Sequence, residues 1–342
     1  MPKKKKKTEI FKWITTFALI GIVAFLIWRE IATYGPDIPG LLKEANYEYI
    51  PFLLLIQLIG YACNACVSIL LLRRIHAKAS LWTNIRIAIG NELGNNFTPY
   101  VGAILASYVS YRRTLKLNAQ DSIFMSASWV LLLILNSILL FIISITILPR
   151  EIIAKNLYLI LFFWTLALAG LAFLYFSLKN KGKNFKRMLI RLCETVNKIC
   201  GLIFKRKIIP LETYDTIITE AGNSLAFFLS EKKQVLPPLL FSFLYYVSDV
   251  LILYFSFLAF HYYPNVALVI FGFIMSSIFA LFISPPAPGV SEAAHTIVFV
   301  ILGFPPHIAL FGVLLYKIVT SWIWIPFSFV YLLRIKHGRE QE

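Results

Sequence analysis

The chain has 342 residues, of which 59% are hydrophobic and 15% are charged, and its mean hydropathy is +0.75. Soluble domains carry about 25% charged and roughly 45–50% apolar residues, so this composition excludes an ordinary soluble protein and indicates a polytopic membrane protein. Lysines and arginines (33) outnumber acidic residues (17), but they cluster in loops beside apolar runs, which favours membrane topology and anionic lipid over nucleic acid.

Six apolar runs are long enough to cross about 30 Å of hydrocarbon as helices. The first follows the lysines of Lys3–Lys7, as the apolar core of a signal peptide would, but no small-residue cleavage motif comes after it. We therefore interpret it as an uncleaved first span. The six predicted spans cover residues 11–28, 49–72, 122–148, 156–178, 236–260 and 308–333.

Two further apolar segments, 82–111 and 266–303, are interrupted by prolines, glycines and polar residues. The interruptions are Asn91–Gly102 and Ser284–Glu292. Backbone outside helical geometry survives at membrane depth only where protein buries it or where it lines a wet cavity. We therefore predict two broken, re-entrant hairpins of half-length helices. A pair of broken segments in matching halves points to a transporter-type site.

The predicted fold class is all-α, a polytopic membrane helix bundle of six full spans and two broken hairpins. Hydropathy makes the two halves a candidate inverted repeat. We expect a single integral membrane domain over residues 1–342. It divides into a first half at 11–178, cytoplasmic amphipathic helices within 179–233, and a second half at 234–336.

Basic residues alternate between the loops in a way that predicts the orientation. They gather at Lys3–Lys7, 73–78, 112–116, 179–233 and 334–339, while the loops between carry few. The positive-inside rule then predicts a multi-pass protein of the cell (plasma) membrane with both termini in the cytoplasm. In this topology the first hairpin enters from the cytoplasmic side and the second from outside, as an inverted repeat requires.

The long basic loop at 179–233 has two amphipathic stretches. Apolar side chains recur at helical spacing over 185–203 and again over 211–228, with lysines and arginines elsewhere on the helical wheel. Basic helices of this kind lie in the membrane interface. They either dock and fix the topology, or they sense anionic headgroups at the cytoplasmic face.

An ionisable side chain inside a span indicates a structural or functional role, because inserting one into the membrane costs about 2.5–3.5 kcal/mol. Asp249 lies in the middle of its predicted span, and Lys317 interrupts the last span. Glu292 and His295 are one helical turn apart just after the second break, and Glu92 lies just before the first. Lys317 either forms a buried ion pair with one of these carboxylates, snorkels toward the interface, or binds a phosphate.

The start of a half-length helix also attracts anions, because its free N–H groups and its dipole favour negative charge. Residues from Val290 onward form such a start, and the same logic applies more weakly after the first break. Asparagines on adjacent turns near that break present amides to a polar cavity or satisfy one another. The candidate substrate-binding residues are therefore Asn95, Asn96, Pro99, Gly102, Asp249, Pro288, Gly289, Ser291, Glu292, His295 and Lys317.

The four cysteines do not form a disulfide framework. Cys63 and Cys66 have a C-x-x-C spacing, but they lie inside an apolar span, where free cysteine packs as a small hydrophobe. The sequence shows no nucleophile–base pair, no phosphate-cradling loop and no metal-ligand cluster of specific spacing. We expect no catalytic residue, no cofactor and no metal.

Two motifs resemble those of a known family. Phe97-Thr98-Pro99 followed by Gly102, and the run Pro286–Ser291, are similar to the breaks of the lysylphosphatidylglycerol synthase transmembrane-region family, the flippase-like domain. That family has a "TP…G" break, a later "PTPG" break, and then a span with a basic residue, whose place Lys317 takes here. The resemblance covers essentially the whole chain and implies the family fold and a lipid substrate.

The chain departs from the family pattern at several positions. Glu292 stands where the family has its last glycine, and His295 stands where it has a glutamate. Ala103 and Ile104 replace charged residues that often follow the first break. Larger relatives carry a cytosolic aminoacyltransferase domain, and since this chain ends at Glu342, shortly after its last predicted span, we expect no such domain here.

The leading functional hypothesis is an integral membrane lipid flippase, or translocator, of a lipid with a polar, phosphate-bearing headgroup. Lys317 and the helix start at Val290–Glu292 would hold the phosphate. One alternative is a membrane transferase acting on a lipid-linked substrate, for which only Glu292 and His295 offer an acid–base pair. Another is a non-catalytic partner subunit of a lipid or glycan synthase. The expected partners are membrane lipids, including anionic lipid at the cytoplasmic face, and such a synthase, with no nucleic acid.

Overall fold

The computed structural model describes residues 45–97, 101–155, 231–283 and 290–337, with scattered residues at 40, 43, 158, 161, 165, 219, 222–224, 226–227 and 230. Every element in these ranges is a helix, as the composition predicts. In chain order they are α3 (Tyr49–Arg74), α4 (Leu81–Phe97), α5 (Val101–Thr114), α6 (Ala119–Ile147), α7 (Arg150–Lys155), α11 (Lys232–Leu258), α12 (Val266–Ile283), α13 (Val290–Ile301), α14 (Pro306–Thr320), the 3₁₀ turn η1 (Trp322–Trp324) and α15 (Ile325–His337).

Four helical stretches in the described part of the chain are long and apolar enough to cross a membrane. They are Tyr49–Arg74, Ala119–Ile147, Lys233–Leu258 and Pro306–Tyr331. These match four of the predicted spans, so the multi-pass membrane class is confirmed. The predicted spans at 11–28 and 156–178, and most of the predicted amphipathic helices at 179–233, lie outside the described residues. The count of six spans therefore stays a prediction.

Helix starts follow local sequence signals. Asn118 precedes α6, and its side-chain oxygen accepts a hydrogen bond from the backbone N–H of Asp121 at 2.7 Å. Asn265 does the same before α12, accepting from the N–H of Ala267 at 2.9 Å. Such caps satisfy N–H groups that have no partner within the helix, which fixes where each helix begins.

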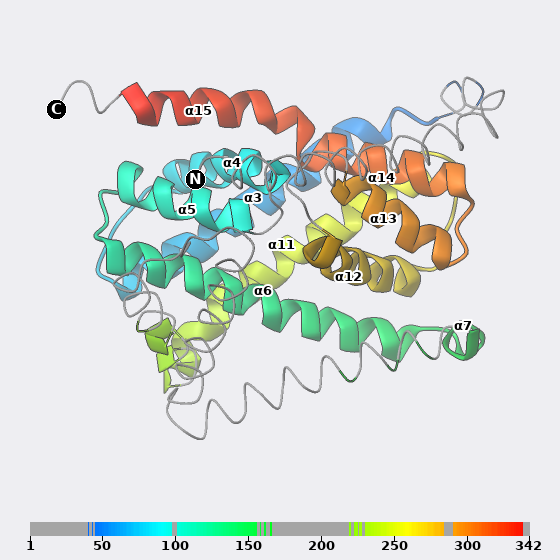
Figure 1. Cartoon of the computed structure of the whole chain (residues 1–342), viewed down its shortest axis with the longest axis horizontal. Coiled ribbons are helices and arrows are strands. Elements are labelled where there is room, and N and C mark those ends of the chain that lie inside the picture. Colours follow the sequence, from blue (N-terminus) through cyan, green and yellow to red (C-terminus); the bar gives the residue numbers. More distant parts are fainter. Residues whose placement is uncertain are drawn as a thin grey trace, which may run out of the picture.

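The helix pairs α4–α5 and α12–α13 form two hairpins of short helices at opposite ends of the long axis (Figure 1). The two helices of each pair pack against each other. The first pair is separated by residues 98–100 and the second by 284–289, within the two interruptions that the sequence shows. Re-entry of the hairpins into a membrane stays a prediction.

Two apolar cores occupy the two ends of the bundle. One surrounds Phe257, Phe271 and Phe299 of α11, α12 and α13, and the other surrounds Leu71 and Tyr111 of α3 and α5. The long helices α3, α6 and α11 contribute to both cores, so each passes from one end of the bundle to the other. Each core therefore packs around one hairpin, and the three long helices join them.

The last predicted span is not one continuous helix. The expectation for 308–333 was a single helix, but α14 ends at Thr320 and α15 begins at Ile325. At Ser321 the backbone has φ −132° and ψ −55°, outside the helical region. Pro326 lies in the first turn of α15, where a proline is tolerated. Its missing N–H and its clash with the carbonyl of residue 322 disfavour a continuous helix, so the local sequence carries a signal for the break.

Candidate functional site

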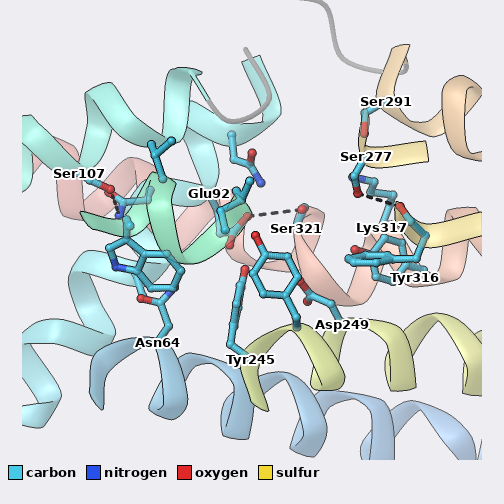
Figure 2. A pocket seen from close by; sticks show the side chains of 18 of the residues that line it. Asn64, Glu92, Ser107, Tyr245, Asp249, Ser277, Ser291, Tyr316, Lys317 and Ser321 are labelled. Atoms are coloured by element: carbon cyan, nitrogen blue, oxygen red, sulfur yellow. Dashed lines mark hydrogen bonds between the residues drawn. The ribbon is translucent and has the colours of Figure 1, made fainter. Parts of the chain in front are cut away.

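A cavity of about 180 Å³ lies in the middle part of α3, α6 and α11, between the two apolar cores (Figure 2). Eight helices and Ser321 supply its lining. Six of the predicted site residues line it. Glu92, the ionisable residue just before the first interruption, also lines it. The six are Asn95, Asp249, Ser291, Glu292, His295 and Lys317.

The remaining predicted site residues cannot be assigned to this cavity. Pro99, Pro288 and Gly289 lie outside the described residues. Asn96 and Gly102 lie in α4 and α5 at the edges of the first break, in a part of each helix where only the backbone is described. A role in substrate binding stays a prediction for all eleven residues.

Glu92 occupies the centre of the cavity. It lies on α4 and is 8% exposed. The hydroxyl of Ser321 donates to Glu92 Oε2 at 3.5 Å, a contact between residues 229 apart in the chain. In Figure 2 this pair separates the part of the cavity near Asn64 and Ser107 from the part near Lys317 and Ser291.

Glu292 lies in the first turn of α13 and is also 8% exposed. The indole Nε1–H of Trp322 donates to Glu292 Oε1 at 3.3 Å. A carboxylate in a first turn is favoured by the helix dipole. This helix start was expected to bind a phosphate, and in the structure the protein's own acidic side chain lies there.

His295 is buried one turn further along α13, at 4% exposure. Its Nδ1 lies 2.7 Å from the carbonyl oxygen of Ser291. Since a carbonyl can only accept, Nδ1 carries a hydrogen and Nε2 of the neutral ring is left as an acceptor. The ring centroid lies 6.0 Å from that of Tyr316. His295 therefore sits in the cavity wall with its orientation fixed by its own helix.

Lys317 extends from α14 into the same cavity. Its Nζ lies 5.6 Å from the centroid of the Tyr316 ring, a cation–π contact that brings no opposite charge to the ammonium. Asp249 of α11 lines the cavity as well, and Figure 2 shows it on the far side of Ser321 from Glu92. Three carboxyl groups and one ammonium thus share a space between two apolar cores.

Several residues that line the cavity were not predicted as site residues, because their side chains are neutral. Serines, tyrosines and one tryptophan within apolar helices carry no signal that separates a cavity wall from a packed core. Asn64 of α3 is one of these neutral lining residues. The additional residues are Asn64, Ser107, Ser126, Trp129, Tyr245, Tyr246, Phe273, Ser277, Tyr316 and Ser321.

Asn91 is a further amide in the cavity wall. Its Nδ2 donates to Ser107 Oγ at 2.6 Å, which ties α4 to α5 within the first hairpin. Its Oδ1 is buried and has no hydrogen-bond partner among the described residues. A buried acceptor without a partner costs free energy unless water or a ligand satisfies it. This side of the cavity can therefore accept a donor from a bound molecule.

Trp324 lies beside the cavity and is partly buried. Its Nε1–H donates to the carbonyl oxygen of Val319 at 2.8 Å, and its ring lies edge-on to Tyr61 with centroids 5.1 Å apart. No group of three or more His, Cys, Asp or Glu residues suited to a metal ion occurs in the described part of the chain.

Comparison with known proteins gives one match. The family model described as lysylphosphatidylglycerol synthase TM region matches residues 13–327, a range that includes every residue of the cavity lining. No curated protein and no solved structure matches the chain.

Proposed function

Because the chain belongs to the lysylphosphatidylglycerol synthase transmembrane-region family, we propose that it is a lipid flippase. Family membership and the membrane helix bundle establish a membrane lipid-related role. The proposal goes further and assigns translocation of a lipid whose polar headgroup bears a phosphate. The headgroup passes through the central cavity while the acyl chains stay in the surrounding lipid.

The observation that carries the proposal is the concentration of polar groups in one cavity between two apolar cores. Charged side chains inside a membrane protein face a bundle interior or a wet cavity, and they mark the path of a polar substrate. Here Glu92, Asp249, Glu292 and Lys317 come from four different helices. These four side chains can replace part of the hydration that a headgroup loses when it leaves the membrane surface.

Each of these side chains has a role in headgroup binding that follows from its chemistry. Lys317 supplies the positive charge for the phosphate, aided by the hydroxyl of Ser291. Glu92 and Asp249 bind donor groups elsewhere on the headgroup, and Asn91 Oδ1 accepts one more hydrogen bond. His295, whose Nδ1 faces the Ser291 carbonyl, offers Nε2 as a hydrogen-bond acceptor for the headgroup.

The arrangement of the hairpins supports alternating access from two sides. Exposed arginines gather where the first hairpin begins and ends, at Arg73, Arg74, Arg112 and Arg113. We assign this end to the cytoplasm by the positive-inside rule, and with it both termini and the cell membrane location. The first hairpin is then re-entrant from the cytoplasm and the second from outside, with the cavity between them.

The test is headgroup accessibility in proteoliposomes. Purified protein is reconstituted with lipids fluorescently labelled on the acyl chain or headgroup, drawn from anionic phospholipids and polyprenyl phosphates. Dithionite then quenches the outer leaflet at once, and the inner leaflet only if lipid crosses. We expect rapid quenching of the inner pool with wild type and a rate at least about tenfold lower with Lys317→Ala, as loss of a charge-assisted contact predicts.

Lys116→Ala is the matched control, because Lys116 is an exposed lysine in the loop before α6. It should quench at the wild-type rate. The proposal is wrong if wild type accelerates crossing of no lipid in the panel, or if Lys317→Ala folds and transports like wild type. New lipid products formed without any crossing would favour the transferase alternative.

A further inference from the structure

The break in the last helix is built from side-chain hydrogen bonds. We call Thr320–Trp324 the joint. The carbonyl of Thr320 accepts from Tyr61 Oη at 3.3 Å and from Gln57 Nε2 at 3.5 Å, and that of Val319 accepts from the Trp324 indole. Backbone freed from a helix inside a membrane must find such partners. Three side chains therefore satisfy backbone carbonyls at the joint.

The two helices on either side of the joint belong to different halves of the bundle. α14 packs against α11 and α13, so closely that a Cβ on Gly312 would lie 2.3 Å from the ring of Phe257. α15 packs instead against α4, where Gly90 faces Tyr331 in the same way. Tyr331 also shares a hydrogen bond of 2.8 Å with Thr114 of α5. The joint thus connects α14, which packs against the second hairpin, to α15, which packs against the first hairpin.

Within the joint, adjacent residues contact one glutamate from each hairpin. Ser321 donates to Glu92 of α4 at 3.5 Å, and Trp322 donates to Glu292 of α13 at 3.3 Å. Both glutamates line the cavity and both are buried. Two successive residues therefore hold the acidic groups of two hairpins that approach from opposite ends.

We propose that Ser321 and Trp322 are positioning residues of the headgroup site, which hold the Glu92 and Glu292 carboxylates in a fixed relation across the cavity. This inference rests on the proposed function only for the claim that the site binds a headgroup. The positions of the two glutamates follow from their contacts with Ser321 and Trp322. Because both contacts lie on one short segment, a movement of either hairpin's glutamate displaces the joint and with it the other glutamate. The joint links the two hairpins at the point where the headgroup binds.

Two other side chains provide matched controls. Ser328 also donates a hydrogen bond toward α4, but to the backbone carbonyl of Ile89. Trp82, at the start of α4, is 59% exposed and does not line the cavity. Trp322→Phe and Ser321→Ala are therefore matched by Trp82→Phe and Ser328→Ala.

The first measurement does not depend on transport. A hydrophobic carbodiimide reacts with carboxyl groups in membrane proteins, and mass spectrometry of the purified protein gives the labelling rate of each glutamate. We expect Trp322→Phe to change the rate at Glu292, and Ser321→Ala the rate at Glu92, by about threefold or more, as loss of a hydrogen bond to a charged group predicts. Each variant should also shift the other glutamate, and Ser321→Thr should restore the wild-type rate. The two control variants should label like wild type.

The second measurement uses phosphatidylcholine vesicles containing fluorescent phosphatidylglycerol at several mole fractions. Ser321→Ala and Trp322→Phe should raise the lipid fraction that gives the half-maximal crossing rate, while the controls leave it unchanged. Unchanged labelling in both joint variants overturns the inference, even if wild type transports lipid. If the labelling of the glutamates changes but the wild type transports no lipid, the inference about the joint is upheld and the proposed function is rejected.

Discussion

Gly60 of α3 packs directly against Ser248 of α11, so that a Cβ at Gly60 would lie 2.7 Å from Ser248 Oγ. This contact draws together the two helices that carry Asn64 and Asp249, one from each wall of the cavity. Close approach at small residues is the usual way in which helices associate in membranes, where no hydrophobic force drives them together. The shape of the cavity thus depends on a glycine outside it.

The first prediction concerns this crossing. Gly60→Ala should be less stable than Gly222→Ala by about 1 kcal/mol, because the added methyl group displaces the Ser248 hydroxyl and with it the hydrogen bond to the Tyr245 carbonyl. The midpoint of thermal unfolding in detergent measures the effect. Gly222→Ala is the control, since no atom lies within 4 Å of a Cβ at that position. Ser248→Gly should restore part of the stability of Gly60→Ala. Equal midpoints for Gly60→Ala and Gly222→Ala would contradict the argument.

A second prediction separates charge from shape at Lys317. Lys317→Arg should keep translocation within about threefold of wild type, because the positive charge and a similar reach remain. Lys317→Met should lose at least about tenfold, since it keeps the apolar stem without the ammonium. Initial rates of dithionite quenching in proteoliposomes give the comparison. If Lys317→Met transports as well as Lys317→Arg, charge is not what the cavity requires.

A third prediction tests the polar link between α6 and α11. Asn136 Nδ2 donates to Ser242 Oγ at 2.7 Å, and both side chains are fully buried. Hydrogen bonds between membrane helices average about 0.6 kcal/mol in double-mutant cycles, with a maximum near 1.7. Asn136→Ala and Ser242→Ala should each destabilise the protein, and the double variant should cost less than the sum. Strict additivity in unfolding experiments would show that the bond contributes nothing.

The inward position of Trp324 gives a fourth prediction. Trp324→Ala should lower the unfolding midpoint markedly, because it loses an edge-on contact with Tyr61 and its bond to Val319. Trp82→Ala should have a smaller effect, since that side chain is 59% exposed. Quenchers carried on lipid tails should reach Trp82 more readily than Trp324. A reversed quenching order would contradict the packing of Trp324 against Tyr61.

A fifth prediction addresses orientation. In a variant without the four native cysteines, Lys78→Cys and Lys116→Cys should react with a membrane-impermeant maleimide only after the cytoplasmic side is opened. Tyr263→Cys, in the exposed loop between α11 and α12, should react in intact cells. The opposite pattern would invert the proposed topology while leaving the fold unchanged. A mixed pattern would contradict the assignment of hairpins to opposite faces.

The ends of α4 at Phe97 and of α12 at Ile283 were predictable because the prolines and glycines that follow them act locally. Proline lacks a backbone donor and restricts the residue before it, and glycine weakens a helix wherever it occurs. The break at Thr320–Trp324 has a local signal in Pro326, but the partners of its carbonyls are distant and could not be predicted. Its carbonyls are satisfied by Gln57 and Tyr61, which lie 263 and 259 residues away in the chain.

By itself the sequence determined the membrane class, the helical fold of the described spans, and the presence of ionisable groups where lipid would penalise them. It also carried the motifs of the family. Only the tertiary structure decided which of those groups meet, and that Glu92 and Glu292 are held by adjacent residues of one joint. The reason is geometric: a sequence fixes which residues share a helix face, but the rotation and crossing of helices decide which faces enclose a common cavity.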